Sequence, residues 1–195
     1  MAVSERAVFL DKDGTLVEDV PYNVDPARIR LMVGAAAGLR RLHAAGYRLF
    51  VVSNQSGVAR GLFAEAALAA VWRRLEELLA EAGVPLAGCY WCPHHPEGSV
   101  ARYAVACACR KPAAGMILRA GREHGLDLAR SWMVGDILHD VEAGRRAGCR
   151  TVLLDNGHET EWLLTAARTP HFRAADLAEA AERILAADEP TGERQ

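Results

Sequence analysis

Short runs of consecutive apolar residues recur along the chain and are separated by longer segments with helical periodicity. Runs without polar alternation predict strands that are buried on both faces of a sheet. The five predicted strands are residues 7–10, 49–52, 88–91, 132–134 and 151–154. The five predicted helices are residues 34–45, 64–82, 113–124, 138–147 and 175–187.

The clearest helical pattern runs over residues 64–82. Apolar side chains recur there every three or four residues, at Leu68, Val71, Trp72, Leu75, Leu78 and Leu79. Arginine and glutamate residues occupy the opposite side of the same helix. This separation predicts a helix that packs one face on the core and exposes the other to solvent.

Strands and helices alternate along the chain, which predicts right-handed βαβ units. The expected fold is α/β: a Rossmann-like three-layer sandwich with a mostly parallel sheet and helices on both faces. In such a sheet, ligands bind at the carboxyl ends of the strands, so polar residues that directly follow a strand are the first candidates for a site. Residues 1–187 are expected to form a single domain, and residues 188–195 a flexible tail.

Composition and charge narrow the range of functions. A chain of 195 residues with 51% hydrophobic content can bury roughly 70% of its unfolded surface as one domain. The net charge is −2, which argues against a nucleic-acid or membrane partner attracted by bulk positive charge. The amino terminus has no apolar run long enough for a signal peptide, so we expect a cytoplasmic protein. A monomer is expected as well.

Two carboxylates, Asp11 and Asp13, directly follow the first predicted strand. A spacing of two residues can aim both side chains the same way. In a water-poor site such a pair can divide its work, with one acid ionised as a nucleophile or metal ligand and the other protonated as a proton donor. The alternative is an ordinary Asp-Gly turn that closes the strand.

Three further polar clusters lie near predicted strand ends or before helices. The loop 53–57 begins with Ser53, Asn54, Gln55 and Ser56, and its hydroxyl, amide and backbone N–H groups can cradle a phosphate or cap a helix. Arg110 and Lys111 can grip phosphate or form a solvated basic pair. Asp136 follows the fourth strand, with Asp140 one turn into the next helix, where it can also serve as an exposed capping acid.

The cysteines favour metal binding over disulfides. Five cysteines are present, and Cys92, His94, Cys107 and Cys109 lie within one short stretch. Three thiolates and one imidazole suit a closed, tetrahedral structural Zn²⁺ site. The alternative is a set of reduced thiols. Cys89 and Cys149 adjoin apolar residues and are expected to be small buried side chains.

The four polar clusters, in this order along residues 7–154, resemble the motifs of the haloacid dehalogenase (HAD) superfamily of phosphatases. The resemblance implies that Asp11 is the nucleophile and that Asp13 is the general acid and base. It also implies that Ser53 and Lys111 stabilise the phosphoryl group. Asp136, Asp11 and the main-chain carbonyl of Asp13 would hold Mg²⁺.

Within this superfamily, the chain is similar to the bacterial D-glycero-D-manno-heptose-1,7-bisphosphate 7-phosphatases. The similarity rests on residues 11–15, residues 53–61 and the run 92–96 of the cysteine-containing insertion. It implies a zinc-binding loop in place of a large cap domain, and a sugar bisphosphate as substrate. The implied substrate contacts are Asp19, Tyr22, Ser53, Asn54, Gln55, Ser56, Arg110 and Lys111.

One position departs from that family. Ile137 stands where the family usually has a lysine after the metal-binding acid, which leaves the exact sugar and its anomer open. A histidinol-phosphate phosphatase is the nearest alternative, although the 12 residues 95–106 make a longer loop than is typical there. An alternative from another class is an inactive, zinc-stabilised binding protein that keeps the same fold.

The other histidines are scattered along the chain and are expected to be surface or packing residues. They are His43, His124, His139, His158 and His171.

Overall fold

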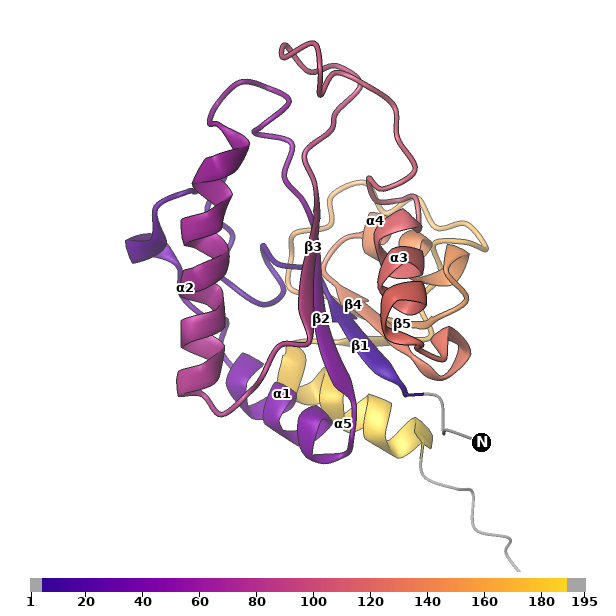
Figure 1. The fold of residues 1–195 in the computed structure, drawn as a ribbon. Helices are drawn as coiled ribbons and strands as arrows, with labels where there is room; N and C mark the ends of the chain where they lie inside the picture. Colours follow the sequence, from indigo (N-terminus) through magenta and orange to yellow (C-terminus); the bar gives the residue numbers. More distant parts are fainter. Residues whose placement is uncertain (1–4, 189–195) are drawn as a thin grey trace, which may run out of the picture.

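A computed structural model describes residues 5–188 of the chain. Six strands of this region form one parallel sheet (Figure 1). They are β1 (Ala7–Leu10), β2 (Arg48–Asn54), β3 (Gly88–Cys92), β4 (Trp132–Gly135), β5 (Arg150–Leu154) and β6 (Phe172–Ala174). Their order across the sheet is β3-β2-β1-β4-β5-β6. The chain therefore starts in the middle of the sheet and reverses its direction of winding between β3 and β4.

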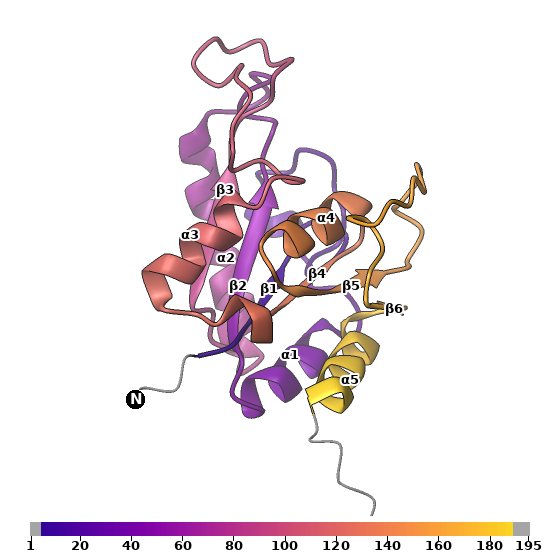
Figure 2. The same cartoon turned by 90° about the vertical axis from the view of Figure 1, so that its right-hand side faces the viewer.

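Helices cover both faces of the sheet and make the molecule three-layered (Figures 1 and 2). One face carries α1 (Ala35–Ala44), α2 (Leu68–Glu81) and α5 (Leu177–Asp188). The other face carries α3 (Gly115–His124) and α4 (Leu138–Arg146). The predicted three-layer parallel α/β fold is thus confirmed.

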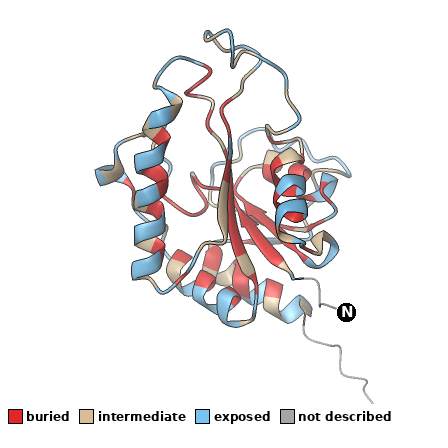
Figure 3. Cartoon of the chain, viewed as in Figure 1, coloured by how far each residue is buried: buried red, intermediate tan, exposed pale blue. Residues whose placement is uncertain are grey.

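The central strand β1 shows why the apolar runs lack polar alternation. Val8 and Leu10 pack into the core under α1, α2 and α5, whereas Ala7 and Phe9 pack into the core under α3 and α4. All four side chains are fully buried, and Figure 3 shows the same burial along the neighbouring strands. A strand with helices on both faces has no solvent side that would favour a polar residue.

All five predicted strands and all five predicted helices are present, with small differences at their ends. The predicted helix 64–82 begins with a 3₁₀ turn, Glu65–Ala67, before α2. Strand β6 was not predicted, because it is an edge strand of three residues that includes the exposed Arg173. Asp188, assigned to the tail from the sequence, is the last residue of α5. The rest of the proposed tail, residues 189–195, lies outside the described residues.

The connections at the carboxyl ends of the strands contain little regular structure. Within residues 5–188 they hold two 3₁₀ turns, Pro26–Arg28 and Glu65–Ala67, and no separate cap domain. One long connection, residues 93–114, joins β3 to α3 and carries most of the cysteine cluster. None of the helices described is long and apolar enough to cross a membrane.

Candidate active site

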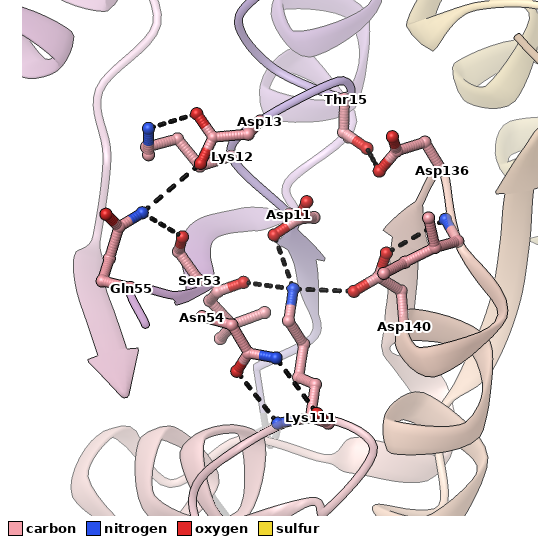
Figure 4. A network of polar contacts seen from close by, with 12 residues as sticks. Asp11, Lys12, Asp13, Thr15, Ser53, Asn54, Gln55, Lys111, Asp136 and Asp140 are labelled. Atoms are coloured by element: carbon pink, nitrogen blue, oxygen red, sulfur yellow. Dashed lines mark hydrogen bonds and ion pairs between the residues drawn. The ribbon is translucent and has the colours of Figure 1, made fainter. Parts of the chain in front are cut away.

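The candidate site lies where β2, β1 and β4 end side by side. Asp11 directly follows β1, Ser53 lies near the end of β2, and Asp136 directly follows β4. Strand pairing continues past β1, because the Asp11 backbone N–H donates to the carbonyl of Val134 at 3.0 Å. The sheet itself therefore brings together groups that are more than 120 residues apart in the chain (Figure 4).

Lys111 is buried at the centre of the site. Its Nζ lies 2.5 Å from Asp11 Oδ1 and 2.6 Å from Asp140 Oδ1, and it donates to the Val52 carbonyl at 2.9 Å. Burial alone would lower the pKa of Lys111, but Asp11 and Asp140 more than offset it, and the net shift is upward. The ammonium is consequently a fixed positive charge beside Asp11.

Three carboxylates, Asp11, Asp136 and Asp140, crowd into the same buried space. They offer oxygen atoms that all lie within 4.8 Å of one another. Burial and the neighbouring carboxylates raise the pKa of Asp136 to about 8. Burial also raises the pKa of Asp140, against the opposing effect of Lys111. One lysine cannot neutralise three acids, so the cluster is short of positive charge, which is the condition that a divalent cation relieves.

Asp13 lies at the rim of the same site and is partly exposed. Burial raises the pKa of its carboxyl group, Lys12 opposes that shift, and Asp11 adds to it. Gln55 Nε2 donates to Asp13 Oδ2 at 3.3 Å and to Ser53 Oγ at 2.8 Å. Gln55 therefore links the first and second polar clusters, and Asp13, with its raised pKa, is suited to carry a proton.

Asn54 is positioned differently from the sequence-based expectation. Its Nδ2 donates to the Lys111 carbonyl at 3.0 Å, and its Oδ1 accepts from the Lys111 N–H at 3.0 Å. Both ends of the amide thus bind the Lys111 backbone, on the far side of the lysine from Asp11 (Figure 4). The side chain fixes the position of Lys111, and the expected contact with substrate gains no support from this geometry.

The alternative interpretation of the Asp136 and Asp140 cluster, a helix cap with an exposed acid, is wrong about the exposure of Asp140. Asp140 does cap α4, since its Oδ2 accepts from the Ile137 N–H at 3.3 Å, but its side chain is fully buried against Lys111. A Cβ on Gly135 would lie 2.2 Å from Asp140 Oδ2. Only glycine at that position lets the carboxylate reach the lysine.

His158 was also interpreted as a surface or packing residue without a link to the metal-binding groups, and this interpretation is wrong. Its Nδ1 lies 2.7 Å from Asp136 Oδ2, while Thr15 Oγ1 donates to Asp136 Oδ1 at 3.1 Å. His158 follows strand β5 closely. Polar residues that follow a strand are candidates for the site in a parallel sheet, and this rule, applied to β5, would have identified His158.

The remaining predicted substrate contacts are Asp19, Tyr22, Ser56 and Arg110. Asp19 and Tyr22 are exposed, and Asp19 is close enough to raise the pKa of Asp13. Arg110 is half-buried, and its Nη1 donates to the carbonyl of His94 at 3.3 Å. The Ser56 carbonyl accepts from the Arg60 N–H at 3.0 Å. These groups come from the connections that follow β1, β2 and β3.

A second cluster of possible metal ligands lies in the connection after β3. Cys92, His94, Cys107 and Cys109 offer ligand atoms that all lie within 4.8 Å of one another. Cys109 Sγ is 3.2 Å from the sulfur atoms of both Cys92 and Cys107, and 3.4 Å from His94 Nδ1. All three cysteines are free thiols. Four soft or borderline ligands gathered around one point fit a tetrahedral zinc site. By contrast, Cys149 is a buried side chain and Cys89 a partly buried one, both outside the cluster.

Known proteins share this fold and these sequence features. The HAD-hydrolase-like family model matches residues 108–180. A D-glycero-beta-D-manno-heptose-1,7-bisphosphate 7-phosphatase from Yersinia pestis is 42% identical over 154 residues, which cover 79% of this chain and 82% of that protein.

Two solved structures support the same relationship. A D,D-heptose 1,7-bisphosphate phosphatase from B. bronchiseptica, complexed with magnesium and phosphate, has a TM-score of 0.74 and 32% identity, covering 93% of this chain and 99% of that one. A structure from Mesorhizobium loti described as a HAD-like phosphatase has a TM-score of 0.82 and 38% identity, covering 94% of this chain and 86% of that one.

The fold is that of a HAD-like hydrolase. The chain belongs to the family of the D-glycero-beta-D-manno-heptose-1,7-bisphosphate 7-phosphatases. Membership agrees with the resemblance seen in the sequence, and it does not by itself assign a role to any single residue.

Proposed function

We propose that this chain is a Mg²⁺-dependent phosphatase that removes the 7-phosphate of D-glycero-D-manno-heptose 1,7-bisphosphate through a phospho-aspartyl intermediate on Asp11. The observation that carries the proposal is the buried group of Asp11, Asp136 and Asp140 around the single ammonium of Lys111. The relatives named as heptose bisphosphate 7-phosphatases support the choice of substrate.

In the first step, a carboxylate oxygen of Asp11 attacks the phosphorus, and the bond from phosphorus to the sugar oxygen breaks. Attack by an anion on a phosphate is opposed by charge repulsion, so positive charge and hydrogen-bond donors must lie ready at the phosphoryl oxygens. Lys111, held between Asp11 and Asp140, supplies fixed positive charge beside the nucleophile. Ser53 supplies a hydroxyl from the adjoining strand.

Asp13 handles the proton in both steps. With its pKa raised, mainly by burial, the protonated acid donates to the departing sugar oxygen. The resulting carboxylate then takes a proton from water, which attacks phosphorus and releases phosphate and free Asp11. Gln55, bonded to Asp13 and Ser53, holds the acid close to the phosphoryl-binding groups.

The residues present fit a magnesium ion. Asp11, Asp136 and the main-chain carbonyl of Asp13 would hold it, with Asp140 close by in the same cluster. Mg²⁺ prefers oxygen ligands, and three buried acids sharing one lysine leave negative charge for it to neutralise. When bound, the ion withdraws negative charge from the phosphate and so favours attack by Asp11.

The cysteine cluster would hold a structural Zn²⁺ through Cys92, His94, Cys107 and Cys109. Four protein ligands leave no open position for catalysis, so such an ion stabilises the loop. The loop leads directly into Arg110 and Lys111, and the Arg110 N–H contacts Cys107 Sγ at 3.4 Å. The zinc site would therefore set the position of two residues of the active site.

Arg110 is the group we assign to the second phosphate of the substrate. Burial is the largest influence on the Arg110 guanidinium and lowers its pKa, and Arg60 lowers it further, so the two cations lie close together. Arg60 in turn lies 3.2 Å from His95 Nε2. A guanidinium binds phosphate through two parallel hydrogen bonds.

Several properties remain predictions. They are the cytoplasmic location, the monomeric state and the substrate contacts by Asp19, Tyr22 and Ser56.

A panel of phosphate esters tests the proposal. Purified protein is assayed against heptose 1,7-bisphosphate, histidinol phosphate and an aryl phosphate, each with Mg²⁺ and with Mg²⁺ removed. We expect Mg²⁺-dependent hydrolysis of the heptose bisphosphate and of the aryl phosphate. The highest kcat/KM is expected for the 7-phosphate of the heptose. A higher kcat/KM for histidinol phosphate would contradict the substrate assignment. If no ester is hydrolysed, the protein is better explained by the alternative of an inactive binding protein.

A further inference from the structure

The segment that follows β5 reaches the active site through three different side chains. Asn156 Nδ2 donates to the carbonyl of Gly14 at 2.7 Å, and His158 Nδ1 lies 2.7 Å from Asp136 Oδ2. Glu159 Oε2 accepts from the Leu138 N–H, the first residue of α4, at 2.6 Å. The segment therefore contacts the loop after β1, the acid after β4 and the start of the next helix.

The contact with Asp136 is one half of a clamp on that carboxylate. Thr15 Oγ1 donates to Asp136 Oδ1 at 3.1 Å, and His158 contacts the other oxygen, Oδ2. Asp136 is almost completely buried, so both of its oxygen atoms need hydrogen-bond partners inside the protein. Each carboxylate oxygen has two lone pairs, so an oxygen that accepts one hydrogen bond can still bind a cation.

The chain makes room for this contact at Gly14. A Cβ at that position would lie 2.1 Å from Asp136 Oδ2 and 2.4 Å from His158 Nδ1. The loop after β1 thus passes directly over the His158–Asp136 pair, and only glycine fits there. When Asp136 is ionised, as a cation ligand must be, its oxygen atoms only accept hydrogen bonds, so His158 then presents the Nδ1 hydrogen to Oδ2.

We propose that His158 is a positioning residue for the magnesium site: together with Thr15 it fixes the orientation of the Asp136 carboxylate. The inference rests on the proposed Mg²⁺ site and extends it to a residue outside the four motifs. Partners that orient a metal-binding side chain contribute roughly 10- to 100-fold to metal affinity. Because the His158 side chain is 35% exposed, we expect the lower end of that range.

The test measures Mg²⁺ binding by titration calorimetry on protein freed of Mg²⁺ by dialysis, without a chelator that would also remove zinc. His158→Ala removes the donor and is expected to weaken Mg²⁺ binding about tenfold. His158→Asn places its Nδ2 hydrogen where the Nδ1 hydrogen lies, one bond beyond Cγ, and is expected to restore most of the affinity. His43→Ala, at an exposed histidine of α1, is the matched control and should bind like the unaltered protein.

Each outcome separates this inference from the proposed function. If the unaltered protein binds no Mg²⁺, the proposed function fails. If the unaltered protein and His158→Ala bind Mg²⁺ equally, the inference alone is overturned. A rise in KM for an aryl phosphate at saturating Mg²⁺, without a change in Mg²⁺ affinity, would make His158 a substrate contact and also overturn it. Weaker Mg²⁺ binding with recovery in His158→Asn supports it.

Discussion

Lys111 Nζ lies 2.6 Å from Asp140 Oδ1, and both side chains are almost completely buried. The same ammonium also lies 2.5 Å from Asp11. One lysine thus pairs with two acids, and a third acid, Asp136, lies beside them. Stability and chemistry depend on the same ion pairs, so altering Lys111 should affect both.

Lys111→Met should abolish turnover and destabilise the fold. Removing one partner of a buried ion pair costs about 3–5 kcal/mol, because the remaining charge stays buried and unpaired. Urea denaturation without Mg²⁺ measures the loss, and adding Mg²⁺ should recover part of it by neutralising the acids. The control is Arg74→Met, which breaks an exposed helix pair with Glu77 and should cost less than about 1 kcal/mol. Equal stability of both variants would contradict the account.

Asn54→Ala tests whether Asn54 supports Lys111 or contacts the substrate. The variant loses both hydrogen bonds to the Lys111 backbone, for which we expect about 2 kcal/mol of lost stability. The displaced lysine should lower kcat more than it raises KM. Steady-state kinetics and thermal denaturation give the two values. A raised KM with unchanged stability would instead indicate that Asn54 contacts the substrate.

Gly14→Ala should remove activity by crowding the His158–Asp136 pair. Gly14 has a φ of +78°, and an added Cβ would lie 2.1 Å from Asp136 Oδ2. Gly46→Ala is a close control, since Gly46 has a φ of +85° with nothing within 4 Å of the added Cβ. Both variants pay about 1–2 kcal/mol for the left-handed backbone, but only Gly14→Ala should lose Mg²⁺ binding. Similar activity in the two variants would refute the crowding argument.

Cys109→Ser should release zinc and loosen the connection into the active site. Elemental analysis is expected to find one zinc per chain before the change and much less after it. Because the loop leads into Arg110 and Lys111, kcat/KM should fall together with the melting temperature. Cys89→Ala is the control, because Cys89 lies outside the cluster. A zinc-free unaltered protein would remove the zinc site from the account.

The strands were predictable because of where they lie in the sheet. Central strands such as β1 are covered by helices on both faces, so their sequences are plain apolar runs. The edge strand β6 has one buried residue, Ala174, and its exposed Arg173 breaks the pattern. Strand β6 is held in the sheet by its backbone pairing with β5. Pairing between segments that are separated in the chain leaves no local pattern in the sequence.

The site was predictable only in part, for a related reason. Asp11 and Asp136 follow strands, so the topology alone brings them to one edge. Asp140 lies within a helix, and its burial depends on Lys111, which reaches it from a different connection. The amide of Asn54 could bind either a phosphate or a backbone group. It binds the backbone of Lys111 because the chain passes beside it there, and the sequence does not show that path. Contacts between loops set by packing were therefore the part that the sequence did not reveal.

The central claim is that Asp11 becomes phosphorylated during turnover. Borohydride reduces an aspartyl phosphate to homoserine, so the reagent is added to the protein during turnover with Mg²⁺, followed by peptide mass spectrometry. We predict homoserine at position 11, with none when substrate is omitted and none in the Asp11→Asn variant, which should fold normally. Active protein with no modification at position 11, or with modification at another carboxylate, would contradict the account.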